Sequence, residues 1–216
     1  MSPRSASVNE EMRRRSRDRL LQATVELVDE RGYERTTLGD IADRAGTARG
    51  LISYYFPGKR QLLQSAVHRL MSTEVEAALE AEPKALGGRE RMARVIDCVL
   101  GMAVDRPTLF RTHMAMIIDP DAAGFQQCSE QQKLAQLLKD TVIRYGTEDP
   151  VDDYRLLRAL LMGGVVGLLL PGAELQPARI RAELFRRYGL DWDQGTPSTA
   201  PPPAWPPPAW PAPWRP

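Results

Sequence analysis

Apolar residues recur at helical spacing along most of this chain, and this recurrence limits the fold more than any other feature. In residues 20–28 and again in residues 62–71, they fall on one face of a helix. The same kind of pattern covers five further stretches, at 89–105, 107–118, 122–145, 153–170 and 177–187. Proline and glycine stand at the breaks between these stretches, where loops are expected. Because no set of strands is indicated, the sequence predicts an all-α protein of about nine helices.

Residues 36–60, TTLGDIADRAGTARGLISYYFPGKR, predict two short helices joined by a turn. Thr37 can cap the first helix, and Asp40 takes the place of the glutamate that usually completes a capping box. Gly46 ends this helix and permits the turn. Ile52, in the second helix, packs into the angle between the two. We therefore expect a helix-turn-helix.

The second short helix carries side chains that suit DNA. Arginine can donate two hydrogen bonds to guanine, while serine and tyrosine hydroxyls bind phosphate oxygens and lysine neutralises a phosphate. The helices predicted at 11–31 and 60–80 complete the core and leave this helix facing outward. It offers Thr47, Arg49, Gly50, Ser53, Tyr54 and Tyr55, followed by Lys59. Tyr55 could instead pack against the first helix of the domain, because it lies one turn after Leu51.

The order of these residues resembles the DNA-binding domain of the TetR family of transcriptional regulators. The resemblance covers residues 17–71 and rests on ATVELVDERGYERTT at 23–37, IADRAGTARG at 41–50 and ISYYFPGKRQLL at 52–63. The ISYYF form is similar to a subgroup that includes betaine-pathway repressors. Carried over residue by residue, the resemblance implies these DNA contacts: Thr37, Thr47, Arg49, Gly50, Ser53, Tyr54, Tyr55 and Lys59.

The resemblance also implies a function and a partner. It describes a repressor that binds a near-palindromic DNA operator as a homodimer and is released by a small-molecule effector. The dimer interface is expected on the helices at 153–170 and 177–187. Three glycines in the first of them, Gly163, Gly164 and Gly167, would let two helices approach closely. An ordinary buried helix is the alternative, since apolarity on all sides indicates burial in either case.

An effector pocket is expected among the C-terminal helices. Methionine and aromatic side chains can line an apolar cavity, although the same residues at helical spacing also fill ordinary cores. Such a cavity suits an apolar or weakly polar molecule better than a highly charged one. The candidate lining residues are Met102, Phe110, His113, Met114, Ile117, Phe125 and Met162.

These interpretations divide the chain into four parts. They are a flexible arm at 1–12, a TetR-like DNA-binding domain at 13–60, a helical ligand-binding and dimerisation domain at 61–190, and a disordered tail at 191–216. The tail repeats PPPAW and should sample polyproline II. It could bind a partner with an aromatic groove, or be an unconstrained extension. Arg13, Arg14 and Arg15, placed before the first helix, could reach phosphate or form a solvated basic turn.

Other classes of protein find little support. The chain has no phosphate-binding loop, dinucleotide fingerprint or HExxH motif, so we expect no enzyme, no catalytic residues and no cofactor. Cys98 and Cys128 lack CxxC spacing and neighbouring histidines in the sequence, so neither a disulfide framework nor a metal site is indicated.

Two further expectations concern the location of the protein in the cell and an alternative to the DNA-binding function. The N-terminus lacks the apolar segment of a secretory signal, and the longest apolar run, residues 160–170, is too short to span a membrane, so we expect a cytoplasmic protein. The alternative function is a helix-turn-helix protein that binds partners through its Pro/Trp-rich tail without sequence-specific DNA binding. The excess of basic over acidic residues in residues 1–70 favours DNA.

Overall fold

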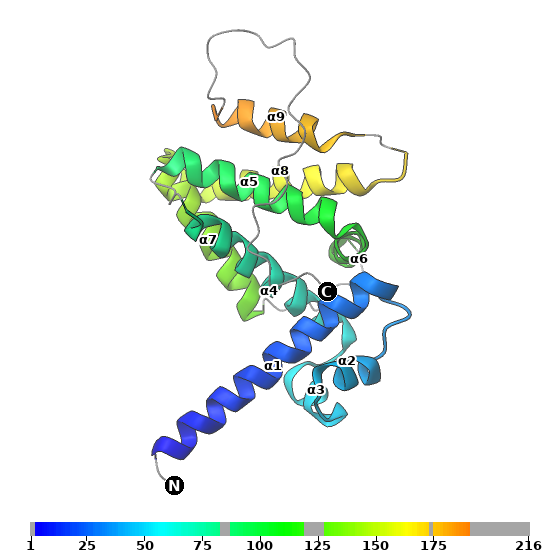
Figure 1. Cartoon of the computed structure of the whole chain (residues 1–216). Coiled ribbons are helices and arrows are strands. Elements are labelled where there is room, and N and C mark those ends of the chain that lie inside the picture. The colour runs from blue at the N-terminus through cyan, green and yellow to red at the C-terminus, as the bar shows by residue number, and fades with distance from the viewer. Residues whose placement is uncertain (1–2, 83–86, 119–127, 173–174, 191–216) are drawn as a thin grey trace. The chain divides into compact units, whose positions relative to one another are not determined.

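The computed structural model describes residues 3–82, 87–118, 128–172 and 175–190, and the regular secondary structure in these ranges is entirely helical. The prediction of an all-α fold is therefore confirmed. In this part of the chain no helix is both long and apolar enough to cross a membrane. The helices, labelled in Figure 1, are α1 (Pro3–Arg31), α2 (Leu38–Ala45), α3 (Arg49–Tyr55), α4 (Lys59–Glu80), α5 (Gly88–Asp105), α6 (Pro107–Ile118), α7 (Ser129–Tyr145), α8 (Pro150–Leu169) and α9 (Pro177–Arg187).

Most helix boundaries agree with the sequence pattern. The bounds of α6 and α9 are those predicted, whereas α8 begins three residues before the predicted 153. Asp149 explains this earlier start, because its Oδ1 accepts hydrogen bonds from the backbone N–H groups of Val151 and Asp152, both at 3.1 Å. Pro150 suits the first turn because it has no N–H to leave unpaired. The predicted tail, 191–216, and the start of the helix predicted at 122–145 lie outside the described residues.

The N-terminal segment differs from the prediction. Residues 3–12, expected to form a flexible arm, belong to α1. Pro3 is well suited to a first helical turn, and the rest of α1 contains no further proline and no glycine. Arg15 also pairs with Glu11 one turn earlier, at 2.6 Å. The basic residues 13–15 therefore lie exposed within the helix rather than before it.

The helices group into two compact units, which we describe separately. The first unit comprises Met1–Ala77 and Arg106–Leu138, and the second comprises Ala78–Asp105 and Lys139–Pro216. In the first unit α1 packs against α2 and α6, and α2 packs against α3. In the second unit α5 packs against α8, which runs beside it in Figure 1, and against α9. Both α4 and α7 begin in the first unit and continue into the second.

The core of the first unit is apolar and joins the first four helices. Its side chains lie at the positions that the helical spacing selected, and each is almost completely shielded from solvent. Burying one such leucine or isoleucine contributes about 1.5–3 kcal/mol to stability. The residues with the least exposure include Leu20 and Leu27 of α1, Ile41 and Ala42 of α2, Ile52 of α3, and Leu62, Leu63 and Val67 of α4.

Local capping fixes both ends of α2. The Thr37 hydroxyl accepts a hydrogen bond from the Asp40 N–H at 3.1 Å, and an Asp40 carboxylate oxygen accepts one from the Thr37 N–H at 2.9 Å. At the other end Gly46 has a φ of 60°, and the Thr47 N–H reaches back to the Ala42 carbonyl at 2.9 Å. The predicted capping box and glycine stop are thus confirmed. They hold the turn that precedes α3.

We expect Thr37→Ala to lower the free energy of unfolding by about 1 kcal/mol, because the side-chain cap is lost. Thr37→Ser keeps the hydroxyl and should unfold close to wild type in urea titration. Hydrogen bonds from Thr37 lower the pKa of Asp40. The contribution of the Asp40 charge to stability is therefore present above the ordinary pKa of aspartate and is lost as the pH falls. Equal unfolding midpoints for Thr37→Ala and Thr37→Ser would contradict the capping argument.

Candidate nucleic-acid interface

The exposed face of α3 gathers four of the eight predicted DNA contacts. Ile52 lies on the side of α3 that packs into the core, and it is buried there. Arg49, Gly50, Ser53 and Tyr54 are exposed, at spacings that place them on one face. Tyr54 has 67% of its surface exposed, which leaves both its ring and its hydroxyl available. This face can therefore offer hydrogen bonds and apolar contact to a DNA groove.

Arg49 lies back against α2. A Cβ atom built on Gly39 would be 2.3 Å from Arg49 Nη2, so the guanidinium occupies the space that this glycine leaves free. A glycine inside a helix costs helix stability, and here it has a packing reason. Gly39 was not among the predicted contacts, and a glycine inside the helix predicted after Thr37 is the signal that could have indicated it.

Tyr54 and Tyr55 have different surroundings. Their rings meet edge to face, with centroids 5.0 Å apart. Tyr55 is half-buried, and its hydroxyl donates to the backbone carbonyl of Arg13 in α1 at 3.2 Å. The structure therefore gives Tyr55 the packing role against the first helix that the sequence left open. Tyr54 is the more accessible of the two to a ligand.

The remaining predicted contacts flank α3. Lys59, at the start of α4, donates a hydrogen bond to the Tyr33 carbonyl, and its ammonium lies 3.9 Å from the centroid of the Tyr33 ring. An ammonium has three N–H donors, so Lys59 can still meet a phosphate. Thr37 is exposed at the N-terminus of α2. Thr47 is half-buried, and among the described residues its hydroxyl has no hydrogen-bond partner.

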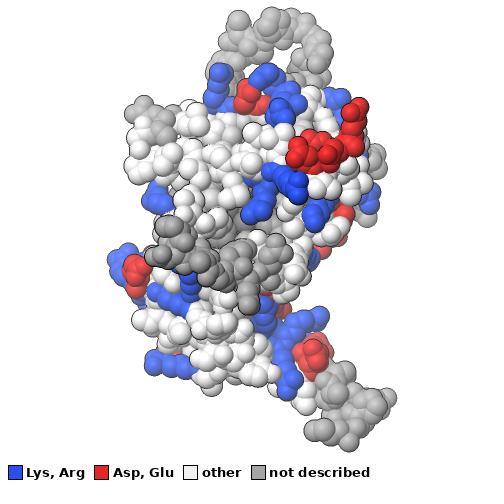
Figure 2. All heavy atoms as spheres, turned by 180° about the vertical axis from the view of Figure 1, so that it is seen from behind, with Lys and Arg blue, Asp and Glu red and all other residues white. Residues whose placement is uncertain are grey.

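Charge alone does not locate the interface. In Figure 2, which views the molecule from behind, blue Lys and Arg side chains and red Asp and Glu side chains both occur over the described surface. Several basic side chains of the first unit are neutralised locally. Arg44, for example, pairs with Glu30 at 2.9 Å and with Glu26 at 3.3 Å. The exposed side chains of α3 therefore mark the candidate interface better than the distribution of charge does.

The residues predicted to line an effector pocket are divided between the units. Phe110, His113, Met114 and Ile117 lie on α6 in the first unit. Phe110 and His113 are at most 2% exposed, and Ile117 is half-buried. Burial, reinforced by the neighbouring His68, lowers the pKa of His113 to about 3, so its ring is neutral. In the second unit, α5 carries the buried Met102 and α8 the half-buried Met162, while Phe125 lies outside the described residues.

The glycines of α8 serve packing within the chain. A Cβ atom on Gly164 would lie 3.0 Å from Ile180 Cγ2, and one on Gly167 would lie 3.1 Å from Leu175 Cδ2. Both glycines therefore let the segment that includes the start of α9 approach α8 closely. Gly163 is different, because it is exposed and a Cβ atom there would meet nothing within 4 Å. Of the three, Gly163 is the one left for a contact outside the chain.

Known proteins are similar to this chain in sequence. A sequence model described as "Bacterial regulatory proteins, tetR family" matches residues 20–66. The chain is 33% identical to HTH-type transcriptional regulator BetI 1 of Chromohalobacter salexigens over 46% of this chain and 50% of that protein, half of its length. It is 28% identical to HTH-type transcriptional repressor KstR of Mycobacterium tuberculosis over 72% of this chain and 70% of that protein.

A solved structure shows the same fold. The crystal structure of a TetR transcriptional regulator from Rhodococcus sp. RHA1 superposes with a TM-score of 0.64 and 20% identity, covering 83% of this chain and 96% of that one. Its likeness extends beyond the segment that the sequence model matches. Taken with the capped α2, the glycine turn and the outward face of α3, these matches support a TetR-family regulatory protein, and the sequence model of the family covers residues 20–66 of it.

Proposed function

We propose that this protein is a transcriptional repressor that binds a near-palindromic DNA operator in the cytoplasm and carries no catalytic activity. The observation that carries the proposal is the exposed face of α3, where Arg49, Ser53 and Tyr54 stand together on a helix held by a buried Ile52. Arg49 would read a guanine edge, and the hydroxyls of Ser53 and Tyr54 would bind phosphate or base. Thr37, Thr47, Gly50, Tyr55 and Lys59 complete the proposed contact set.

The operator-binding form is proposed to be a homodimer built on α8 and α9. One stripe of α8, spaced every four residues from Leu157 to Leu169, is buried within the second unit. Elsewhere on this helix Ala159 and Gly163 are exposed, and Leu170, just beyond it, is 55% exposed. The small side chains of Ala159 and Gly163, which lie beside the exposed Arg155 and Arg158, support close pairing across a twofold axis. The two copies of α3 would then meet half-sites about 34–36 Å apart.

Release by a small molecule is proposed to act through α4. This helix begins directly after the connection from α3 and continues from the first unit into the second. An effector bound by the predicted pocket residues would favour one arrangement of α4, and operator affinity would fall by the effector's difference in affinity for the two states. Equal effector affinity for free and operator-bound protein would contradict this mechanism.

Operator selection from random DNA fragments tests the proposal directly. The wild type should enrich a near-palindrome. Arg49→Ala should weaken binding by about 1–3 kcal/mol and relax the preference at one symmetric pair of positions. Arg89→Ala, which removes an exposed arginine of α5, should leave both properties unchanged. Enrichment of no sequence, together with weak binding that salt abolishes equally in all three proteins, would exclude a specific operator.

A further inference from the structure

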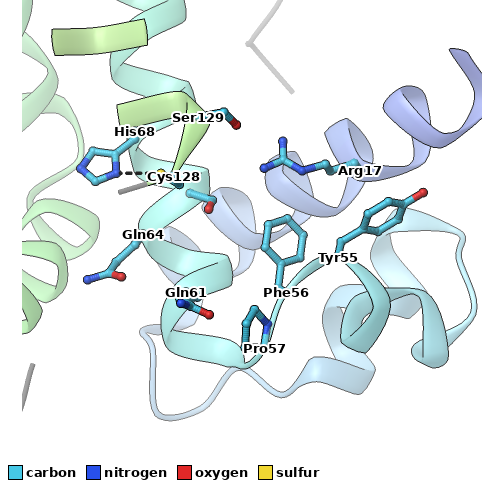
Figure 3. A pocket seen from close by; sticks show the side chains of 10 residues that line it. Arg17, Tyr55, Phe56, Pro57, Gln61, Gln64, His68, Cys128 and Ser129 are labelled. Atoms are coloured by element: carbon cyan, nitrogen blue, oxygen red, sulfur yellow. Dashed lines mark hydrogen bonds between the residues drawn. The ribbon is translucent and has the colours of Figure 1, made fainter. Parts of the chain in front are cut away.

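A cavity of about 200 Å³ lies in the first unit at the C-terminal end of α3 (Figure 3). One side of it is formed by Tyr55, Phe56 and Pro57, which end α3 and lead into α4. The other side is formed by His68 of α4 and by Cys128, just before α7. A cavity of about 150 Å³ can hold a benzene-sized molecule. This cavity therefore has room for a ligand of one ring.

The cavity opens onto a cysteine that has a base beside it. Cys128 Sγ lies 3.5 Å from His68 Nδ1, the contact drawn as a dashed line in Figure 3. His68 is 5% exposed and Cys128 is half-buried, whereas Cys98, the other cysteine, is 5% exposed and does not line the cavity. Sequence reasoning missed this pair because sixty positions separate the two residues.

A buried carboxylate two residues from the cysteine has one oxygen without a hydrogen-bond partner among the described residues. Glu130, two residues after Cys128, is 8% exposed. Its Oε1 forms an ion pair with Arg17, which lines the cavity, while its Oε2 has no hydrogen-bond partner among the described residues. Buried polar atoms usually have a partner. A polar ligand or water in this region would supply one.

We propose that Cys128 is a covalent modification site for small electrophilic carbonyl compounds, such as one-ring quinones and maleimides. The sulfur adds to the carbon–carbon double bond conjugated with the carbonyl, so an S–C bond forms as the π bond breaks. His68 Nδ1 takes the thiol proton and returns it to the resulting enolate, so no external oxidant or reductant is needed. Burial raises the pKa of the Cys128 thiol, so the group is protonated at neutral pH and this base is required.

An adduct at Cys128 would press on the element that reads DNA. Phe56 is 4% exposed, and its ring lies 5.1 Å from the Arg17 guanidinium carbon. The Phe56 N–H also closes α3 by donating to the Ile52 carbonyl at 2.8 Å. A group bonded to Cys128 inside the cavity would contact Phe56 and Arg17, and these contacts would favour one arrangement of the end of α3 over others. This effect on DNA rests on the proposed function, whereas the modification itself does not.

The experiment treats full-length wild type, Cys128→Ser and Cys98→Ser with N-ethylmaleimide in native buffer. Intact mass and peptide mapping should show one adduct, on Cys128, in the wild type and in Cys98→Ser, and none in Cys128→Ser. His68→Gln should slow the reaction near neutral pH but not at a pH high enough to ionise the thiol, and a thermal melt checks that this variant is folded. Labelling of Cys98 instead, or of neither cysteine, would overturn the site.

Operator binding is then compared before and after labelling. The Cys128 adduct should bind the selected operator about tenfold more weakly, within the usual range of coupling between sites. Cys128→Ser treated in the same way should keep its affinity. An adduct on Cys128 that leaves operator affinity unchanged would overturn the link to α3. If unlabelled protein selects no operator at all, the proposed function fails, and the mass measurement still decides the modification site.

Discussion

Phe110→Ala is expected to lower the free energy of unfolding by about 3–5 kcal/mol, because it removes a fully buried aromatic ring. Phe110 has no exposed surface in α6, and the residue before it, Leu109, is equally buried in the core of the first unit. Urea titration followed by circular dichroism measures the change. Phe110→Leu keeps most of the apolar volume and should cost less than about 1.5 kcal/mol.

The same pair of variants separates two roles for α6. A residue that only lines an effector pocket faces empty space or a ligand, so truncating it in ligand-free protein removes few packing contacts. A loss of less than about 1 kcal/mol for Phe110→Ala would therefore favour the pocket, while the full loss favours a packed core. Burial lowers the pKa of His113 to about 3, so His113 would then belong to that core as a neutral ring.

Gly88→Ala is expected to lower the free energy of unfolding by at least about 1–3 kcal/mol, because the added methyl group would overlap backbone atoms of the second unit. A Cβ atom on Gly88 would lie 1.9 Å from the Arg144 carbonyl oxygen and 2.5 Å from the Tyr145 Cα. Backbone atoms cannot rotate aside as a side chain does, so the start of α5 and the end of α7 have to separate.

The neighbouring glycine provides the matched control. A Cβ atom on Gly87 would meet nothing within 4 Å, so Gly87→Ala should change the free energy of unfolding by no more than about 0.5 kcal/mol. Thermal and urea unfolding of the two variants give the comparison. Equal stabilities would show that α5 and α7 do not approach each other closely at Gly88.

The features that could be predicted from the sequence depend on residues close together in the chain. The helices follow from apolar spacing, and the ends of α2 follow from Thr37, Asp40 and Gly46, all within ten positions. The face of α3 could be predicted for the same reason, since one helical turn fixes which side chains share a side. Residues 3–12, expected to belong to a flexible arm, lie in α1, where Pro3 stands in the first turn and no glycine or further proline interrupts the helix.

The features that were missed depend on side chains brought together from distant positions. Arg49 fills the space above Gly39, and Lys59 caps the carbonyl of Tyr33, neither of which spacing alone can indicate. Cys128 and His68 meet only because α4 and the start of α7 share one unit. Such contacts follow from tertiary packing, so a single sequence identifies the residue types but not the pairs.

The first unit is made of two stretches that are not continuous in the chain, and this matters for building chimaeric regulators. Leu109 and Met116 of α6 belong to the same apolar core as α1 to α4, and Arg60 of α4 donates a hydrogen bond to the Met116 carbonyl at 2.7 Å. A chimaera that takes only Met1–Ala77 from this protein would lack the α6 side chains of this core. A helix of the other protein would have to pack in their place. A transferable form of the proposed DNA-binding unit has to carry Arg106–Leu138 as well.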